Sequence, residues 1–267
     1  VHNSILHLEN LVRSLRREGL GDVDGDQLII VDDGSGDLTG RALRSLQREF
    51  KVMELLTNDK NKGFSCSVNI GVSRATNDLC LLLNSDTIMP GNLLGNLVEA
   101  WEHTDNRSII GFPSNNAGYQ SIVDPRDSQL WKRLGESGIH KISEILEALF
   151  GRGGLIEWPQ VHGSLMAFDR QFFNKLNGFD EEAFPRGYGE EVDFCLRAKA
   201  EGAEIYLCMS SAYSHFGSAS FSSEEKQDLL SDSRLILRER HGERYSALVE
   251  ALQGQKAIKR LLPLVSP

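Results

Sequence analysis

Two apolar segments of the sequence are followed by carboxylates, and one of these, Asp86, could bind a divalent cation. Asp32 and Asp33 come directly after the run that ends at Val31, and Asp86 follows the leucine-rich run 79–83. Carboxylate oxygens are preferred ligands of Mg²⁺ and Mn²⁺, and a bound divalent cation attracts phosphates. Taken singly, each group could be no more than an aspartate in a capped turn. Two such groups together favour a site for a cation and a phosphorylated ligand.

A third group of carboxylates consists of Glu190, Glu191 and Asp193, in the first turn of a predicted helix. The helix dipole favours negative charge there, so a role in helix stability is the alternative for all three. Glu190 and Asp193 are three residues apart and share a face, whereas Glu191 points elsewhere. We therefore expect these side chains to have different roles.

The elements that must position these residues alternate between strands and helices. Predicted strands cover 27–31, 51–56, 79–83, 108–112, 161–168 and 203–207, and predicted helices cover 4–17, 38–50, 93–101, 190–201 and 223–252. This alternation is typical of βαβ units and predicts an α/β fold with a mainly parallel sheet flanked by helices. Ligands of such sheets bind at the carboxyl ends of the strands, where the aspartates fall. Segment 113–158 shows few strand signals and is predicted to be an insertion over one rim of the sheet.

The composition limits the class of protein and of partner. The 267 residues are 40% hydrophobic and 25% charged, as in a globular protein, and the formal net charge of -9 argues against a nucleic-acid partner. The four cysteines are widely spaced, and no stretch reads as a signal peptide or a membrane-spanning helix, which favours a cytoplasmic location. The acidic balance favours small molecules, neutral polymers or cations as partners.

Six short motifs occur in an order that is similar to that of a known family. They are Val31-Asp32-Asp33-Gly34-Ser35, Asn61-Lys62-Gly63-Phe64-Ser65 with Asn69-Ile70-Gly71, Leu81-Leu82-Leu83-Asn84-Ser85-Asp86-Thr87, His162-Gly163-Ser164, Gly178-Phe179-Asp180-Glu181, and Glu190-Glu191-Val192-Asp193-Phe194-Cys195-Leu196-Arg197. His215 follows them. The set resembles the family 2 glycosyltransferases of the inverting GT-A type, particularly the bacterial rhamnosyltransferase-like branch.

The resemblance implies a fold, a division of the chain and a reaction. It implies a Rossmann-like GT-A domain over residues 1–221, followed by a C-terminal helical extension over 222–267. In the family, residues similar to Val1-His2-Asn3-Ser4 follow an apolar first strand, so we expect a first strand that is truncated here. The implied reaction moves a sugar from a nucleotide-diphosphate donor, with UDP- or dTDP-sugars favoured, to a hydroxyl of a glycan or lipid-linked acceptor. Polysaccharide biosynthesis at the cell envelope would be the setting.

The resemblance also implies a role for each matching residue. Asp33 would contact the nucleotide base with Asp32 beside it, and Asp86 would hold Mg²⁺ or Mn²⁺, with His215 as a further metal or diphosphate contact. Glu191 would be the general base, with Glu190 beside it. The remaining candidates are Lys62 and Asn69 on the nucleotide side and Trp158, His162, Gly163 and Asp193 on the acceptor side. A solvated loop lysine is the alternative for Lys62, and core packing is the alternative for Trp158.

Two departures from the family pattern and three alternatives stay open. Asn84 replaces the first aspartate of the D-x-D motif, and Glu191 replaces an aspartate, which leaves the choice of base between Glu190 and Glu191. A sugar nucleotidyltransferase would need a Gly-rich, basic phosphate loop after the first strand, and none is visible. A noncatalytic sugar-binding domain is the other alternative to an enzyme. The tail helices are predicted to pack on the core, with a partner domain or a peripheral contact at the inner membrane face as alternatives.

Overall fold

A computed structural model of the chain describes residues 1–21, 25–50, 52–122, 128–217 and 223–255. A central sheet has the order β3(Leu79–Leu83), β7(Leu165–Asp169), β5(Ile109–Gly111), β8(Ile205–Cys208), β6(Leu155–Glu157). Two smaller sheets pair β1(Leu28–Asp32) with β2(Met53–Thr57), and β4(Thr87–Ile88) with β9(Ser214–His215). In the alternative to core packing, the tail would contact a membrane through Lys256, Lys259 and Arg260, and these residues lie outside the described residues.

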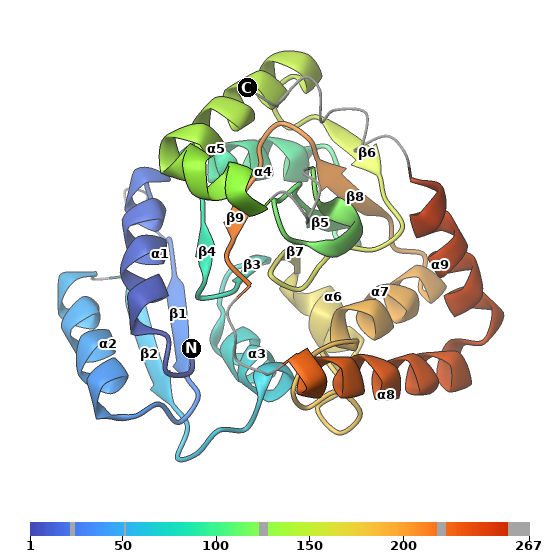
Figure 1. Ribbon diagram of the computed structural model, residues 1–267, viewed down its shortest axis with the longest axis horizontal. Coiled ribbons are helices and arrows are strands. Elements are labelled where there is room, and N and C mark those ends of the chain that lie inside the picture. Colours follow the sequence, from blue (N-terminus) through green and yellow to red (C-terminus); the bar gives the residue numbers. More distant parts are fainter. Residues whose placement is uncertain (22–24, 51, 123–127, 218–222, 256–267) are drawn as a thin grey trace.

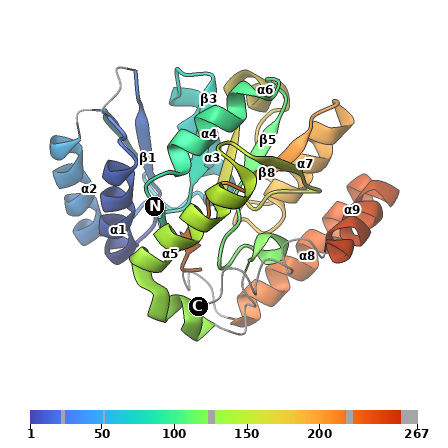
Figure 2. The same ribbon diagram turned by 90° about the horizontal axis from the view of Figure 1, so that it is seen from above.

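The described helices surround these sheets. They are α1(Ile5–Arg17), α2(Asp37–Glu49), α3(Phe64–Arg74), α4(Leu93–Glu102), α5(Ser128–Phe150), α6(Arg170–Lys175), α7(Glu190–Ala200), α8(Ser223–His241) and α9(Glu243–Gly254), with a 3-10 turn at Gly118–Gln120. Helices α1 and α2 lie beside β1 and β2, while α8 and α9 lie at the opposite end of the molecule (Figures 1 and 2). Within the described part of the chain, no helix is long and apolar enough to cross a membrane.

Side-chain alternation along the strands builds a hydrophobic cluster on each face of the central sheet. On β7, Met166 and Phe168 join a cluster with residues of α3, α6 and α7, whereas Leu165 and Ala167 join a cluster with residues of α1 and α4. Successive residues of a strand point to opposite faces, so one apolar run can serve both. Phe194 of α7 lies inside the first cluster, where its ring centroid is 5.0 Å from that of Phe173. This packing holds the helix that begins with Glu190.

The fold class is the one predicted, but the prediction of a mainly parallel sheet is wrong in detail. Among the described strands, β1 and β2 pair in parallel, as do β5 and β8, while β7 runs antiparallel to both β3 and β5. Strands β6 and β8, and β4 and β9, are antiparallel too. A parallel neighbour requires a connection that crosses to the opposite end of the strands before the next strand begins. The insertion between β5 and β7 instead returns the chain at the end where β5 stops. Strand β7 therefore runs antiparallel to β5.

Candidate active site

The short sheet of β4 and β9 brings Asp86 and His215 together. Thr87 is paired with His215, and His215 Nε2 lies 3.4 Å from Asp86 Oδ1 with both side chains buried. The other ring nitrogen, Nδ1, lies 2.7 Å from the carbonyl oxygen of Asn116. Because a carbonyl can only accept, Nδ1 carries a hydrogen and Nε2 is directed at the carboxylate. Burial lowers the pKa of His215, but the hydrogen bond and charge of Asp86 outweigh it and raise the pKa above the usual value.

This pair fits a divalent cation by its donor chemistry. A carboxylate oxygen and an imidazole nitrogen that is oriented by a backbone carbonyl are both ligands of Mn²⁺, and a carboxylate suits Mg²⁺. Among the described residues, no cluster of three or more His, Cys, Asp or Glu side chains could hold a metal ion. Asp86 and His215 would supply two ligands, and water and ligand oxygens would complete the coordination.

The two aspartates after β1 are buried but are used differently. The Asp33 carboxylate accepts hydrogen bonds from Asn58 Nδ2 at 2.8 Å, Lys62 N at 2.8 Å and Gly63 N at 2.9 Å. Asp33 therefore ties the loop that precedes α3 to the end of β1. The Asp32 carboxylate accepts a hydrogen bond from Ser35 N at 3.1 Å, through Oδ1. Of the two carboxylates, that of Asp32 accepts fewer hydrogen bonds.

The carboxylates of Glu190 and Glu191 form a coupled pair at the start of α7. Glu190 Oε2 accepts a hydrogen bond from Gly189 N at 3.0 Å, whereas Glu191 Oε2 is buried and meets no hydrogen-bond partner among the described residues. Burial raises the pKa of both groups, and the charge of Glu191 raises the pKa of Glu190 further. Of the two, Glu190 has the pKa that is raised further, so Glu191 is the member that ionises first.

One short segment, His162 to Ser164, connects the two groups of side chains. The ring of His162 lies 5.7 Å from that of His215, and His162 Nδ1 is 2.9 Å from Ser164 Oγ. Burial, and next the charge of His215, lower the pKa of His162 to about 3, so the imidazole is neutral. A Cβ at Gly163 would lie 3.4 Å from Glu190 Oε1 and 3.5 Å from Glu191 Cβ. The Asp86–His215 pair and the Glu190–Glu191 pair therefore flank a single segment.

Sequence comparison decides the family. The family model described as glycosyl transferase family 2 matches residues 1–176. This chain belongs to that family. A second model, described as the N-terminal domain of galactosyltransferase, matches residues 153–217. Between them the two matches include each of the carboxylate groups of this glycosyltransferase.

Solved structures show that the family 2 chain has a Rossmann-like GT-A fold. Mannosyltransferase PcManGT from Pyrobaculum calidifontis, in complex with GDP-Man and Mn²⁺, aligns with a TM-score of 0.63 at 16% identity, over 99% of this chain and 70% of that one. GalNAc-T7 with UDP, GalNAc and Mn²⁺ aligns with a TM-score of 0.60 at 15% identity, over 97% of this chain and 51% of that one. S. aureus TarS 1-349 in complex with UDP-GlcNAc aligns with a TM-score of 0.58 at 15% identity, over 97% of this chain and 72% of that one. This chain thus spans about half the length of GalNAc-T7.

Two predicted nucleotide-side residues of the glycosyltransferase make other contacts. Lys62 Nζ lies 3.6 Å from Asp59 Oδ1 with its side chain 39% exposed, as expected of a solvated loop lysine. Asn69 Nδ2 donates to Phe179 O and to Glu181 Oε1, both at 2.8 Å, and its Oδ1 accepts from Phe179 N at 2.9 Å. The Asn69 amide therefore holds the segment that leads to α7, which corrects the prediction of nucleotide binding by this side chain.

Asp193 was predicted on the acceptor side, but the structure places it beneath α8. Its carboxylate is fully buried and accepts from Arg197 Nε at 2.7 Å and from His241 Nε2 at 2.8 Å, with Arg240 Nη1 at 3.5 Å. Each carboxylate oxygen thus has a cationic or hydrogen-bonding partner of its own. Asp193 joins α7 to the end of α8 and is fully buried, so it positions the helix on which Glu191 lies.

We expect Asp193→Ala to lower the free energy of unfolding by about 3 kcal/mol, because it leaves buried partners unpaired. Asp180→Ala is the matched control, since Asp180 is 28% exposed and binds the same Arg240 at 2.7 Å. An exposed pair of this kind contributes less than about 1 kcal/mol. Urea unfolding of the two variants measures the difference. Equal losses would contradict the assignment of Asp193 as a buried anchor.

Trp158 is also part of the structure and not of an open sugar-binding face. Its side chain is 3% exposed and belongs to the hydrophobic cluster that includes Phe168 and Phe194. The backbone N of Trp158 donates to Ile205 O at 2.8 Å, which fixes the segment beside β8. The core-packing alternative therefore replaces the prediction of a stacking platform.

Sequence reasoning missed three residues that hold the site, two in the insertion and one directly before β9. Asn115 Oδ1 accepts from His215 N at 2.7 Å, and Asn116 O binds the His215 ring. Tyr213 is fully buried, and its OH lies 2.6 Å from Ser164 Oγ. The available signal was the polar loop after β5, because a polar loop at the carboxyl end of a sheet strand is a common place for site residues.

Proposed function

We propose that this chain is an inverting glycosyltransferase that moves a sugar from a nucleoside-diphosphate donor to a hydroxyl of a glycan or lipid-linked acceptor. The observation that carries the proposal is the buried, unpartnered Oε2 of Glu191, beside the segment His162–Ser164 that also borders the Asp86–His215 pair. A buried carboxylate oxygen without a partner is costly to the fold, so its retention supports a role in proton transfer.

The donor diphosphate is bound at the strand ends in this proposal. Asp86 and His215 would hold the divalent cation, which when bound would supply positive charge to the leaving diphosphate. Asp32, at the end of β1, contacts the nucleoside, while Asp33 keeps the loop 58–63 in place. His162 lies between the Asp86–His215 pair and the Glu190–Glu191 pair. Its imidazole is neutral, so it offers no positive charge that would draw the diphosphate away from the Asp86–His215 pair.

Glu191 acts as the general base and Glu190 positions it. The acceptor hydroxyl gives its proton to Glu191 as its oxygen forms a bond to the anomeric carbon and the bond from that carbon to the diphosphate breaks. Displacement in one step inverts the configuration and needs no covalent nucleophile. Glu190 retains its own proton and donates a hydrogen bond to Glu191, which keeps Glu191 ionised within a buried environment.

The pH profile of kcat/KM is expected to show an acid limb above 4.5, the ordinary pKa of a glutamate. Burial raises the pKa of Glu191, and the base is inactive when protonated, so activity falls as the pH drops through that raised value. Initial rates at low donor concentration between pH 4 and 8 measure the limb. A rate that stays constant down to the ordinary pKa would contradict a buried carboxylate as base.

A panel of nucleotide sugars tests the function as a whole. UDP-, dTDP- and GDP-sugars are each added with Mn²⁺, with Mg²⁺ and with neither, and the melting temperature is followed. We expect an increase with one nucleotide class, UDP or dTDP by preference, that requires the cation. Release of the nucleoside diphosphate in the presence of acceptor then distinguishes an enzyme from a binding domain. The absence of any response would overturn the donor site.

A further inference from the structure

The candidate site is rich in carboxylates, so the positive charge around it needs an account. Asp86 belongs to one pair of side chains in the site, and Glu190 and Glu191 form the other pair. Like charges repel, and a diphosphate that binds beside these groups therefore needs positive charge close to it. A bound divalent cation would supply part of this charge, and cationic side chains that face the site supply more.

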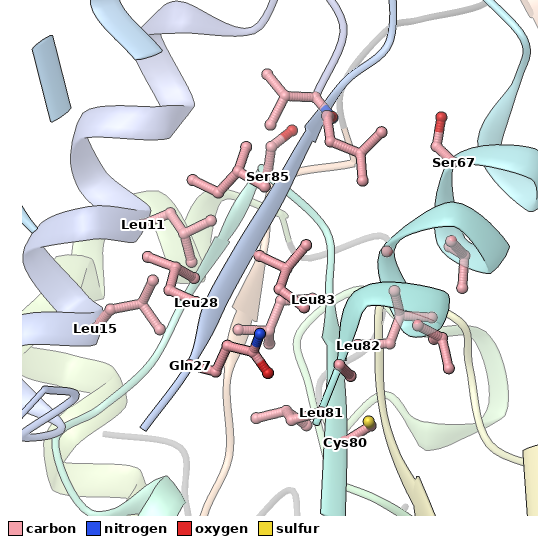
Figure 3. Close-up of a pocket in the computed structure, with 18 of the residues that line it drawn as sticks. Leu11, Leu15, Gln27, Leu28, Ser67, Cys80, Leu81, Leu82, Leu83 and Ser85 are labelled. Carbon is pink, nitrogen blue, oxygen red and sulfur yellow. The ribbon is translucent and has the colours of Figure 1, made fainter. Parts of the chain in front are cut away.

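Two neighbouring features contribute little positive charge. The cavity between β1 and β3 is lined by Leu11, Leu28 and Leu83 among others, and no charged side chain of the described residues lines it (Figure 3). Lys62, in the loop before α3, lies 3.6 Å from Asp59 Oδ1, so that carboxylate partly balances its charge. A further cation has to come from another element of the fold.

Lys226, near the start of α8, lies over the loop that leads to the proposed base. Its Nζ is 5.7 Å from the centre of the Tyr188 ring, which is a cation–π distance. Tyr188 comes two residues before Glu190, and the backbone N of Gly189 between them donates to Glu190 Oε2 at 3.0 Å. The Lys226 ammonium is therefore next to the loop that borders the Glu190 carboxylate.

The ring of Tyr188 lies close to both pairs of the site. Its backbone φ is +67°, between Gly187 at +89° and Gly189 at +147°, and a residue other than glycine rarely adopts this conformation. Backbone strain of this kind is common at ligand sites. Burial raises the pKa of the Tyr188 hydroxyl, and the charges of Glu190 and Asp86 raise it further. A cation that rests on this ring is consequently near the space between the two pairs.

The two histidines of the site respond to the charge of Lys226. Burial and the charge of His215 lower the pKa of His162, and the charge of Lys226 lowers it further. At His215, burial and the charge of Lys226 both oppose the rise in pKa that Asp86 causes. His162 lies between the two pairs, so its response agrees with the placement of Lys226 over the middle of the site.

The position of Lys226 does not serve the stability of α8. It is the fourth residue of the helix, directly after Glu224 and Glu225. The start of a helix carries a partial positive charge, which favours those glutamates and disfavours a lysine. Glu225 Oε1 lies 3.8 Å from Arg186 Nη2, whereas the exposed Lys226 has no ion-pair partner among the described residues. An unpaired cation beside an acidic site is well placed to bind an anion.

We propose that Lys226 binds the β-phosphate of the nucleoside-diphosphate donor. The inference rests on the proposed function and adds one residue to its donor site. The β-phosphate carries the sugar, so it lies between the Asp86–His215 pair and the base, where Tyr188 and His162 place the ammonium. As the bond to the anomeric carbon breaks, its electron pair stays on the phosphate oxygen, and Lys226 stabilises that charge.

The departure at Asn84 gives this lysine additional weight. Asn84 stands where the D-x-D motif has its first aspartate, so this chain contributes less negative charge to hold a divalent cation. Positive charge that is part of the chain does not depend on the affinity for that cation. Lys226 would therefore support the binding of the diphosphate both with and without the metal.

Titration of UDP and UMP into Lys226→Met tests the proposal, with the dTDP or GDP pair used where the panel favours that base. Methionine keeps an unbranched side chain and removes the charge. We expect the diphosphate to bind at least about tenfold more weakly than to the parent, with and without Mn²⁺, because a charge-assisted hydrogen bond is lost. The monophosphate, which has no β-phosphate, should bind within about twofold of the parent. Lys226→Arg should restore the binding, since arginine also binds phosphate.

Two control variants separate the role of Lys226 from other effects. Lys199→Met removes the same charge from an exposed lysine in the last turn of α7, at the far end from Glu190, and should bind UDP as the parent does. Glu225→Gln breaks the ion pair with Arg186 and keeps the lysine, so it reports whether the seating of α8 alone affects the nucleotide. A loss in Glu225→Gln as large as that in Lys226→Met would overturn the proposal.

The remaining outcomes distinguish this inference from the proposed function. If the parent binds UDP and Lys226→Met binds it equally well, the inference is wrong and the proposed function stands. An equal loss for UDP and UMP also overturns it, because the charge would not act on the β-phosphate. Unchanged UDP binding with a raised KM for a phosphorylated acceptor would assign the lysine to the acceptor and not to the donor. A parent chain that binds none of the nucleotides would contradict both the proposed function and this inference.

Discussion

Glu191→Gln is expected to lower kcat by about 10³-fold while binding of the nucleoside diphosphate stays within about twofold of the parent chain, since general-base catalysis contributes 10²–10⁴-fold. Glutamine keeps the length and volume of the side chain but cannot accept a proton. The buried Oε2 of Glu191 is the atom at which the proton of the acceptor would arrive. Single-turnover rates and calorimetric titration of the nucleotide measure the two quantities separately.

Glu190→Gln is the matched control for this prediction, because the two side chains are adjacent and coupled. Its expected loss is about tenfold or less, since a glutamine amide at position 190 can still donate a hydrogen bond to Glu191. Burial raises the pKa of Glu191 in the folded protein. The contribution of this carboxyl group to folding stability is therefore fully present below the ordinary pKa and is lost as the pH rises through the raised pKa. Glu191→Gln should therefore be at least as stable as the parent at pH 8. Equal kinetic losses in both variants would contradict the assignment of Glu191 as base.

The local elements were predictable from the sequence because their signals are local. The apolar run Leu79–Leu83 is β3 with the predicted bounds, and the carboxylate-rich start of α7 lies at Glu190 as expected. The direction of β7 was not predictable in the same way. An apolar run is the same for a parallel and an antiparallel neighbour, and only the path of the insertion between β5 and β7 sets its direction.

The residues of the candidate site show the same difference between local and long-range signals. Asp86, Glu190 and Glu191 lie at the ends of strands or helices, so their positions follow from the type of element. The structure brings the Asp86–His215 pair and the Glu190–Glu191 pair to one segment, 162–164. Asp193 follows the same local rules, but its partner His241 lies 48 residues away along the chain. Residue type and spacing contain no information on such a partner. A motif is therefore a reliable sign that a carboxylate has a role in the protein. It is a less reliable sign of whether the partner of that carboxylate is a ligand or another helix.

Asp86→Asn is expected to weaken Mn²⁺-dependent binding of a nucleoside diphosphate by about 10³-fold and to leave the much weaker metal-free binding unchanged, because a metal contact is worth several kcal/mol. The amide has the size of the carboxylate but no charge. Asp86 is the carboxylate that lies beside His215, and among the described residues no cluster of three or more possible ligands could replace it. Titrations with and without Mn²⁺ measure the difference.

Asn84→Asp tests the same site in the opposite direction. Asn84 lies two residues before Asp86, and its backbone N and O bind Ser164 O and Thr87 N, so a changed side chain leaves these bonds in place. A second carboxylate raises the negative charge available to the cation, and charge count among the ligands tunes the affinity for divalent ions. The Mn²⁺ concentration needed for half-maximal nucleotide binding should then fall about tenfold, by the 1.4 kcal/mol that one such factor represents. If Asp86→Asn binds as tightly as the parent with Mn²⁺, or if Asn84→Asp needs more Mn²⁺, the cation does not bind at this edge of the sheet.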